Sequence, residues 1–185
     1  MKTVTKTYDV YTFEELSQEA KDKAREKWIT NNDYPFLSDY LNERLHELLE
    51  ENKIKDTNDT SKPNTKPTPV LYSLSHCQGD GAMFEGTFEW QHLKKTYTAV
   101  IKQSGYYYHY NSKTIELTYE DKDGNEHEAD EKTYTHFNDI YVTICQLLAQ
   151  DGYNYIDYEN SEECFRETCE ANEYNFLADG TMVNY

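Results

Sequence analysis

A thiol, an imidazole and a carboxylate lie close together in the sequence, at Cys77, His76 and Asp80. A cysteine nucleophile needs its thiol within hydrogen-bonding distance of a histidine base, and a third group to orient that base. Neighbouring strand residues point to opposite faces, so His76 and Cys77 would meet only across a turn. We therefore interpret Gln78–Gly81 (QGDG) as a turn beside a buried cysteine, and we expect no catalytic residues.

The other cysteines and histidines lack the spacing of metal ligands. Cys164 and Cys169 are separated by a spacing that does not place both on one face of a helix. Cys77 and Cys145 have no cysteine near them, and His109, His127 and His136 fall in separate predicted elements. The sequence therefore predicts no structural zinc.

One short segment, Asp121–Glu126 (DKDGNE), resembles the opening of a calcium-binding loop. Such a loop ends in a bidentate glutamate, and Lys132 stands at that position. A turn between strands is the better interpretation. No glycine-rich phosphate-binding motif and no nucleophile-elbow motif occurs either, so we expect neither a metal nor a cofactor.

Alternating and apolar segments predict an antiparallel sheet of about five or six strands. Val70–Leu74 and Phe84–Trp90 flank the QGDG turn and are predicted to pair as a hairpin. Further segments with strand composition are 4–13, 96–103, 105–110 and 113–120, with a turn at 121–125.

Helices are predicted on both sides of this sheet in the sequence. Thr12 and Glu15 have the spacing of a capping box, and Ser17 is a second possible N-cap before a helix that ends at 31–33. A second helix over 35–51 is predicted to pair with the first in a helical hairpin. The C-terminal part adds a helix over 136–150 that stops at Gly152, a helix over 161–172, and a small terminal hairpin about residues 179 and 180.

These elements predict an α+β fold in a single domain, 1–185. Within it we expect a strand plus a helical hairpin (1–52), a linker or mobile loop (53–69), an antiparallel sheet (70–135) and an acidic helical part with a terminal hairpin (136–185).

The formal net charge of −17 narrows the classes of partner. Direct binding of DNA, RNA or an anionic membrane needs lysine and arginine, so the charge argues against these partners and favours a basic protein or simple solubility. The sequence has no apolar run long enough for a transmembrane helix and no signal-peptide pattern at its start. Its four cysteines, not closely paired, suggest free thiols in a reducing cytoplasm. The oligomeric state is open.

The acidic residues gather in two segments, and their carboxylates are the candidate partner-binding groups. One interpretation is a solvated, self-repelling surface; the other is a surface that imitates nucleic-acid phosphates and occupies a basic groove. The first segment contains Glu120, Asp121, Asp123, Glu126, Glu128, Asp130 and Glu131. The second segment contains Glu159, Glu162, Glu163, Glu167 and Glu170.

Three motifs, YTFEELSQEAKDKA, CQGDGAMFEG and ANEYNFLADG, together resemble a group of small phage and prophage proteins of mostly unassigned function. The resemblance spans the beginning, middle and end of the chain. It implies a phage origin and a cytoplasmic location in an infected bacterium, and it implies no catalytic residues.

Three hypotheses for the function follow. The first is a non-enzymatic anti-defence protein that binds a basic host nuclease, such as a CRISPR effector, and blocks its nucleic-acid groove through the acidic surface. The second is an antitoxin-like or regulatory phage protein that binds another small protein through salt-tolerant, apolar contacts. The third is an enzyme that uses the QGDG loop.

Overall fold

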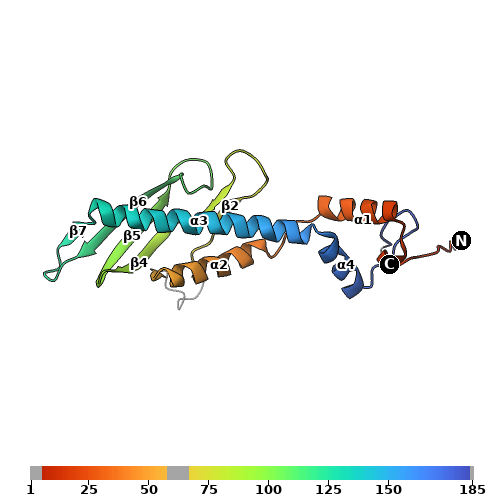
Figure 1. Cartoon of the computed structure of the whole chain (residues 1–185), viewed down its shortest axis with the longest axis horizontal. Coiled ribbons are helices and arrows are strands. Elements are labelled where there is room, and N and C mark those ends of the chain that lie inside the picture. Colours follow the sequence, from red (N-terminus) through yellow and green to blue (C-terminus); the bar gives the residue numbers. More distant parts are fainter. Residues whose placement is uncertain (1–5, 58–66, 184–185) are drawn as a thin grey trace, which may run out of the picture. The chain divides into compact units, whose positions relative to one another are not determined.

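The computed structural model describes residues 6–57 and 67–183 and has an α+β fold, as the sequence predicts (Figure 1). The chain divides into two compact units. Within the described residues, unit 1 comprises the chain up to Pro35 and from Tyr155 onward, and unit 2 comprises Phe36–Asn154. None of the helices in the described part combines the length and the apolar character needed to cross a membrane.

Unit 2 is built on a five-stranded sheet in which every neighbouring pair of strands is antiparallel. The spatial order is β1-β4-β5-β6-β7, so only the edge strand β1 joins out of sequence order. The strands are β1 (Ile54–Asp56), β4 (Gly86–His92), β5 (Lys95–Gln103), β6 (Lys113–Glu120) and β7 (Glu126–Glu128).

One face of this sheet forms the core of unit 2. Alternation along β4, β5 and β6 buries Phe88, Trp90, Ile101 and Leu117 on the same side. Two helices, α2 (Leu37–Glu51) and α3 (Glu131–Glu159), supply the apolar side chains that cover it, and in Figure 1 α3 runs across the strands. The opposite face of β5 and β6 presents threonine, glutamate and lysine to solvent.

The predicted hairpin around the QGDG turn is smaller than expected. β2 (Leu71–Ser73) pairs with β3 (Gly81–Met83) in a separate two-stranded sheet, whereas the segment that contains Trp90 pairs with β1 and β5. The prediction that Val70–Leu74 pairs with Phe84–Trp90 was therefore wrong. A short strand directly after the turn was sufficient to close the hairpin, which freed β4 for the main sheet.

Unit 1 is a smaller helical assembly. It contains a short 3-10 helix, η1 (Phe13–Glu15), followed by α1 (Gln18–Thr30), and it is completed by α4 (Glu162–Ala171) and the C-terminal segment. Its buried core consists of Phe13, Leu16, Ala20, Ala24, Phe165, Cys169 and Phe176.

The caps predicted for these helices are confirmed. The Glu15 carboxylate accepts a bond of 2.8 Å from the Thr12 N–H, as in a capping box. The hydroxyls of Ser17 and Ser161 accept bonds from the N–H groups at the starts of α1 and α4. The C-terminal turn also forms, with bonds from Leu177 N–H to the Thr181 carbonyl and from Gly180 N–H back to the Leu177 carbonyl.

Two segments predicted as strands are not strands. Of residues 4–13, Val4 and Thr5 lie outside the described residues, Tyr11 forms an isolated bridge with Phe176, and Phe13 begins η1. Residues 105–110 (GYYYHY) form a loop between β5 and β6. Tyrosine favours strands, but here Gly105 takes a φ of +113° and the chain bends away from the sheet.

The segment 53–69 was expected to be a linker or mobile loop. Ile54–Asp56 instead forms β1 and pairs with Phe88–Trp90 of β4. Thr68, almost fully buried, donates its N–H to the Asp56 carboxylate at 2.8 Å. Residues 58–66 lie outside the described part of the chain.

Helix α3 is longer than predicted at both ends, and Gly152 does not stop it. Gly152 is buried, and a Cβ atom there would meet the Leu74 side chain. Close approach of another segment, and not the end of a helix, therefore explains this glycine.

The two N-terminal helices belong to different units. α1 contributes Ala20 and Ala24 to the core of unit 1, whereas Leu41 and Leu45 of α2 are fully buried in unit 2. The predicted pairing of these helices in a hairpin does not match this division, because the spacing of apolar residues shows that a helix has a buried face but not what covers it.

Candidate protein-binding surfaces

The first acidic segment occupies β6, β7 and the start of α3. In the register of the two strands, Glu120 lies opposite Glu126 and Thr118 lies opposite Glu128. Because paired residues and every second residue of a strand share a face, Glu116, Glu120, Glu126 and Glu128 lie together on the side of the sheet away from α3. We call these four residues the acidic strand face.

The acidic strand face has a cost in stability. Glu120 and Glu126 are a directly opposed pair of like charges, which destabilises an antiparallel pair of strands. Among the described residues, the ion pair that involves one of these four glutamates is Lys102 with Glu116, at 3.9 Å and solvent-exposed. A weak exposed pair of this kind offsets little of the repulsion.

Two of the predicted partner-binding acids instead hold the local structure together. Asp121 lies 2.8 Å from His127 Nε2, which donates to it in the tautomer with the hydrogen on Nε2, and Asp121 accepts further bonds from the N–H groups of Asn125 and Asp123. The His127 bond and then the Asn125 bonds hold the pKa of Asp121 well below its usual value. Asp130 caps α3, because it accepts from the Thr133 N–H and hydroxyl at 2.9 and 3.0 Å. These bonds lower the pKa of Asp130, the backbone bond most.

The remaining members of the first segment, Asp123 and Glu131, are exposed. The second segment belongs to unit 1, whereas the acidic strand face belongs to unit 2. Glu162 and Glu163 occupy the first turn of α4, where the helix dipole stabilises negative charge, and Glu167 accepts a bond of 3.3 Å from Tyr158. The other two acids, Glu159 and Glu170, are half-buried and exposed, respectively.

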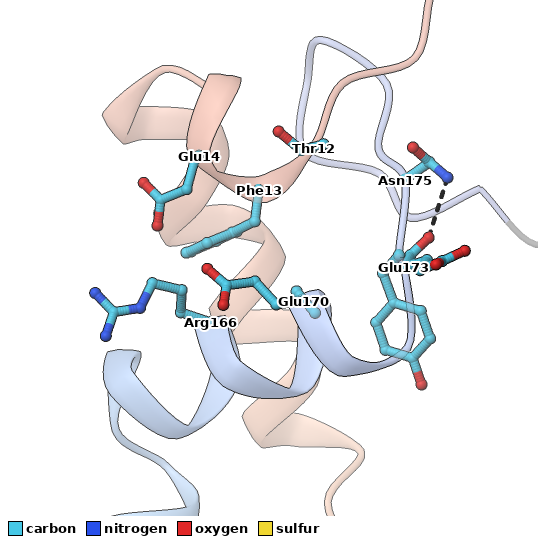
Figure 2. Close-up of a pocket in the computed structure, with 9 residues that line it drawn as sticks. Thr12, Phe13, Glu14, Arg166, Glu170, Glu173 and Asn175 are labelled. Atoms are coloured by element: carbon cyan, nitrogen blue, oxygen red, sulfur yellow. Dashed lines mark hydrogen bonds between the residues drawn. The ribbon is translucent and has the colours of Figure 1, made fainter.

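Unit 1 contains a pocket of about 400 Å³ that no sequence pattern predicted (Figure 2). Phe13, Cys169 and Tyr174 supply its apolar lining. Its polar lining consists of Thr12, Glu14, Arg166, Glu170, Glu173 and Asn175. Figure 2 shows Glu14 coming from η1, and Arg166 and Glu170 coming from α4.

The chemistry of this pocket suits the binding of a charged group. Burial raises the pKa of Cys169 to about 12, so its thiol stays protonated at neutral pH and is a poor nucleophile. Three carboxylates and one guanidinium suit a small cationic or zwitterionic group. Sequence spacing could not reveal the pocket, because its walls come from both ends of the chain.

In unit 2, the Asp80 carboxylate organises the loop between β2 and β3. It accepts bonds from the N–H groups of Ser75 and Cys77 at 2.6 and 2.9 Å, and from the hydroxyls of Ser73 and Tyr153, each at 2.9 Å. Burial raises the pKa of Asp80, but these bonds together outweigh it, so the pKa lies well below its usual value. The carboxylate ties the loop to α3 through Tyr153.

The groups of the possible nucleophile and base do not meet in this loop. The His76 ring lies against the Tyr153 ring, tilted by 30° with 4.7 Å between centroids, and Cys77 Sγ lies 3.6 Å from the Ser75 carbonyl. Cys77 is exposed, which corrects the expectation of a buried cysteine. The turn directs the Cys77 N–H toward the Asp80 carboxylate and leaves the Cys77 thiol exposed to solvent.

The loop between β5 and β6 packs against this loop. The Tyr107 ring lies so close to Gly79 that a Cβ atom there would be 2.7 Å from it, and His109 is similarly close to Gly81. Figure 1 shows both loops protruding at the same end of the sheet. An open hollow of about 440 Å³ lies there, lined by Gln78, Gly79, Asp80, Tyr107, His109, Asn111 and Ser112.

In the described part of the chain, no group of three or more histidine, cysteine or acidic side chains is placed to hold a metal ion. The four cysteines are free thiols, as expected. No protein-family model, no curated protein and no solved structure matches the chain.

Proposed function

We propose that the protein acts by binding a basic partner protein through the acidic strand face. The observation that supports this proposal most directly is the register of β6 and β7, which places four glutamates on one exposed face and two of them opposite each other. An arrangement that costs stability is retained more readily when a cationic partner neutralises it.

The proposed partner is a nucleic-acid-binding protein, and the phage resemblance makes a host defence nuclease, such as a CRISPR effector, the specific candidate. Alternate strand residues repeat at about 6.8 Å, which is twice the axial spacing of phosphates along one DNA strand, about 3.4 Å. A basic groove that holds a phosphate backbone would therefore meet carboxylates in comparable rows. In this role the protein blocks the groove and performs no reaction itself.

The test is a cleavage assay with purified basic nucleases, including a guide-loaded CRISPR effector, in the presence of the wild-type protein. A variant with Glu116, Glu120, Glu126 and Glu128 all changed to Gln removes the acidic strand face. A control variant with Glu19→Gln, Glu26→Gln, Glu43→Gln and Asp139→Asn removes the same charge from exposed positions elsewhere.

We expect the wild type and the control to inhibit at least one nuclease, and the strand-face variant to inhibit about tenfold more weakly or worse, because charge complementarity governs association. Raising the salt concentration should weaken inhibition by the wild type. If no nuclease is inhibited, or if the strand-face variant inhibits as well as the control, the proposed function is wrong.

A further inference from the structure

A second surface of unit 2 carries exposed tyrosines on the loop between β5 and β6. Tyr106, Tyr107 and Tyr108 are 98%, 59% and 39% exposed, side by side in the sequence. With Gln78 and Asn111, which line the adjoining hollow, we call them the tyrosine surface. Clustered, exposed aromatic side chains on a monomer mark an interaction site far more often than isolated ones do.

The backbone beneath the tyrosine surface is firmly held. The Ser104 N–H donates to the Ser112 carbonyl at 2.9 Å, which closes the base of the loop, and the Ser112 N–H donates to the His109 carbonyl at 2.7 Å. At the end of the loop, Lys113 Nζ donates to the Tyr110 carbonyl at 2.9 Å. The neighbouring loop is fixed by the bonds to Asp80. A loop ordered before binding loses less conformational entropy when it docks.

The composition of this loop is that of a protein-recognition loop. Residues 104–112 read SGYYYHYNS, and all but the histidine belong to the set enriched in antibody binding loops: tyrosine, serine, glycine and asparagine. Tyrosine offers a large contact area with few rotatable bonds, and it is among the side chains most enriched at binding hot spots.

The charges around the tyrosine surface select the kind of partner. Residues 103–112 contain no charged side chain, and the carboxylate of Asp80 is already bonded within its own loop. The ammonium of Lys113 is held by the Tyr110 carbonyl. A nucleic acid could stack its bases on the tyrosines, but this loop supplies no cation for the phosphates, and the net charge of −17 repels them.

We propose that the tyrosine surface docks a basic protein by receiving arginine side chains on the faces of its tyrosine rings. Arginine binds aromatic faces by cation–π interaction and stacking, and arginine and tyrosine are both enriched at hot spots. The inference rests on the proposed function, because it assigns the same basic partner a second contact. This contact, unlike the acidic strand face, resists screening by salt.

The probe is a displayed library of random peptides selected on the immobilised protein at about 0.5 M salt, where interactions between exposed charges are largely screened. Recovered peptides are then measured on Tyr106→Ser and on Tyr106→Ser/Tyr107→Ser. The control is Tyr8→Ser/Tyr134→Ser, which removes tyrosines that are 56% and 39% exposed in other parts of the chain. Tyr106→Ser alone leaves the loop packing intact, because that side chain is almost fully exposed.

We expect the peptides to be rich in arginine and to bind the tyrosine-surface variants about tenfold more weakly or worse, with unchanged binding to the control and to the strand-face variant. Recovery of no peptide, recovery without arginine enrichment, or equal binding to the tyrosine-surface variants would overturn the inference. The nuclease assay is scored separately, so its failure would remove the proposed partner without altering the peptide result.

Discussion

Asp80 shows how one residue can fix the shape of a loop. Its carboxylate collects bonds from β2, from its own loop and from α3, and the tyrosine surface is built against the same loop. The two residues that suggested chemistry, His76 and Cys77, make separate contacts, with the Tyr153 ring and the Ser75 carbonyl respectively. The sequence indicated a turn at these residues. What holds the turn is the set of hydrogen-bond donors that converge on the Asp80 carboxylate.

Replacing Asp80 with Asn should lower the free energy of unfolding of unit 2 by about 2 kcal/mol, because an amide leaves donors without an anionic acceptor. Urea unfolding monitored by tryptophan fluorescence measures the change. The matched control is Asp123→Asn, at an exposed position in the β6–β7 turn. Equal stability of the two variants would contradict the role assigned to Asp80.

The lowered pKa of Asp80 also predicts a pH dependence. A carboxylate whose pKa is lower in the folded state stabilises the fold fully above its unfolded pKa, about 3.9, and this stabilisation is lost as the pH falls toward the folded pKa. The difference in stability between wild type and Asp80→Asn should therefore be constant above about pH 5 and shrink below about pH 4. A difference that grows on acidification would have the wrong sign.

At the scale of elements, the cores of helices and strands could be predicted from the sequence, whereas their partners could not. The caps Thr12, Ser17 and Ser161 are local signals, because donor and acceptor lie within one turn of each other. The loop at 105–110 was assigned to the sheet because tyrosine favours strands, yet its neighbour across space, the loop at 74–80, is distant in the sequence. Likewise, the glycine at position 152 is explained by the close approach of Leu74, which no local sequence pattern could indicate.

The acidic segments show the same limit. The strand register brings Glu120, Glu126 and Glu128 to one face, which alternation along the sequence could have indicated. It could not have indicated that Asp121 and Asp130 are occupied by bonds to their own turns, because that depends on side-chain rotamers.

The C-terminal turn of unit 1 provides a test of how tightly this element docks. Gly180 and Gly124 have nearly the same φ, +82° and +81°, but a Cβ atom at Gly180 would meet the backbone carbonyl of Ala20, whereas one at Gly124 would meet nothing within 4 Å. Changing Gly124 to Ala should cost about 1 kcal/mol of stability, from left-handed strain alone. Changing Gly180 to Ala should cost roughly 3 kcal/mol, since a steric clash is added to that strain.

Urea unfolding of the two alanine variants gives the comparison. Because the two φ angles match, the difference between the two costs reports mainly on the packing of the turn against α1. Equal costs would mean that the turn moves away from Ala20 freely.

At the scale of the molecule, each compact unit contains one of the two tryptophans, Trp28 in unit 1 and Trp90 in unit 2. In a Trp90→Phe variant, fluorescence reports on unit 1, and in a Trp28→Phe variant it reports on unit 2. The substitution always lies in the unit that is not being observed, so each signal reflects an unaltered core.

We expect unit 1 to unfold at a lower urea concentration than unit 2, because its buried core is much the smaller and small cores bury a smaller fraction of their surface. Unfolding curves of the two variants under identical conditions provide the measurement. Superimposable curves would show instead that the two units unfold as one cooperative body.

The division of the chain has a consequence for its synthesis on the ribosome. Unit 2 is one continuous stretch, whereas α1 must wait for α4 and the C-terminal turn, which are made more than a hundred residues later. At translation rates of about 5–20 residues per second, this interval is on the order of 10 s. During that time the nascent chain carries the uncovered apolar face of Phe13, Leu16 and Trp28, a target for chaperones, while the sheet can already form.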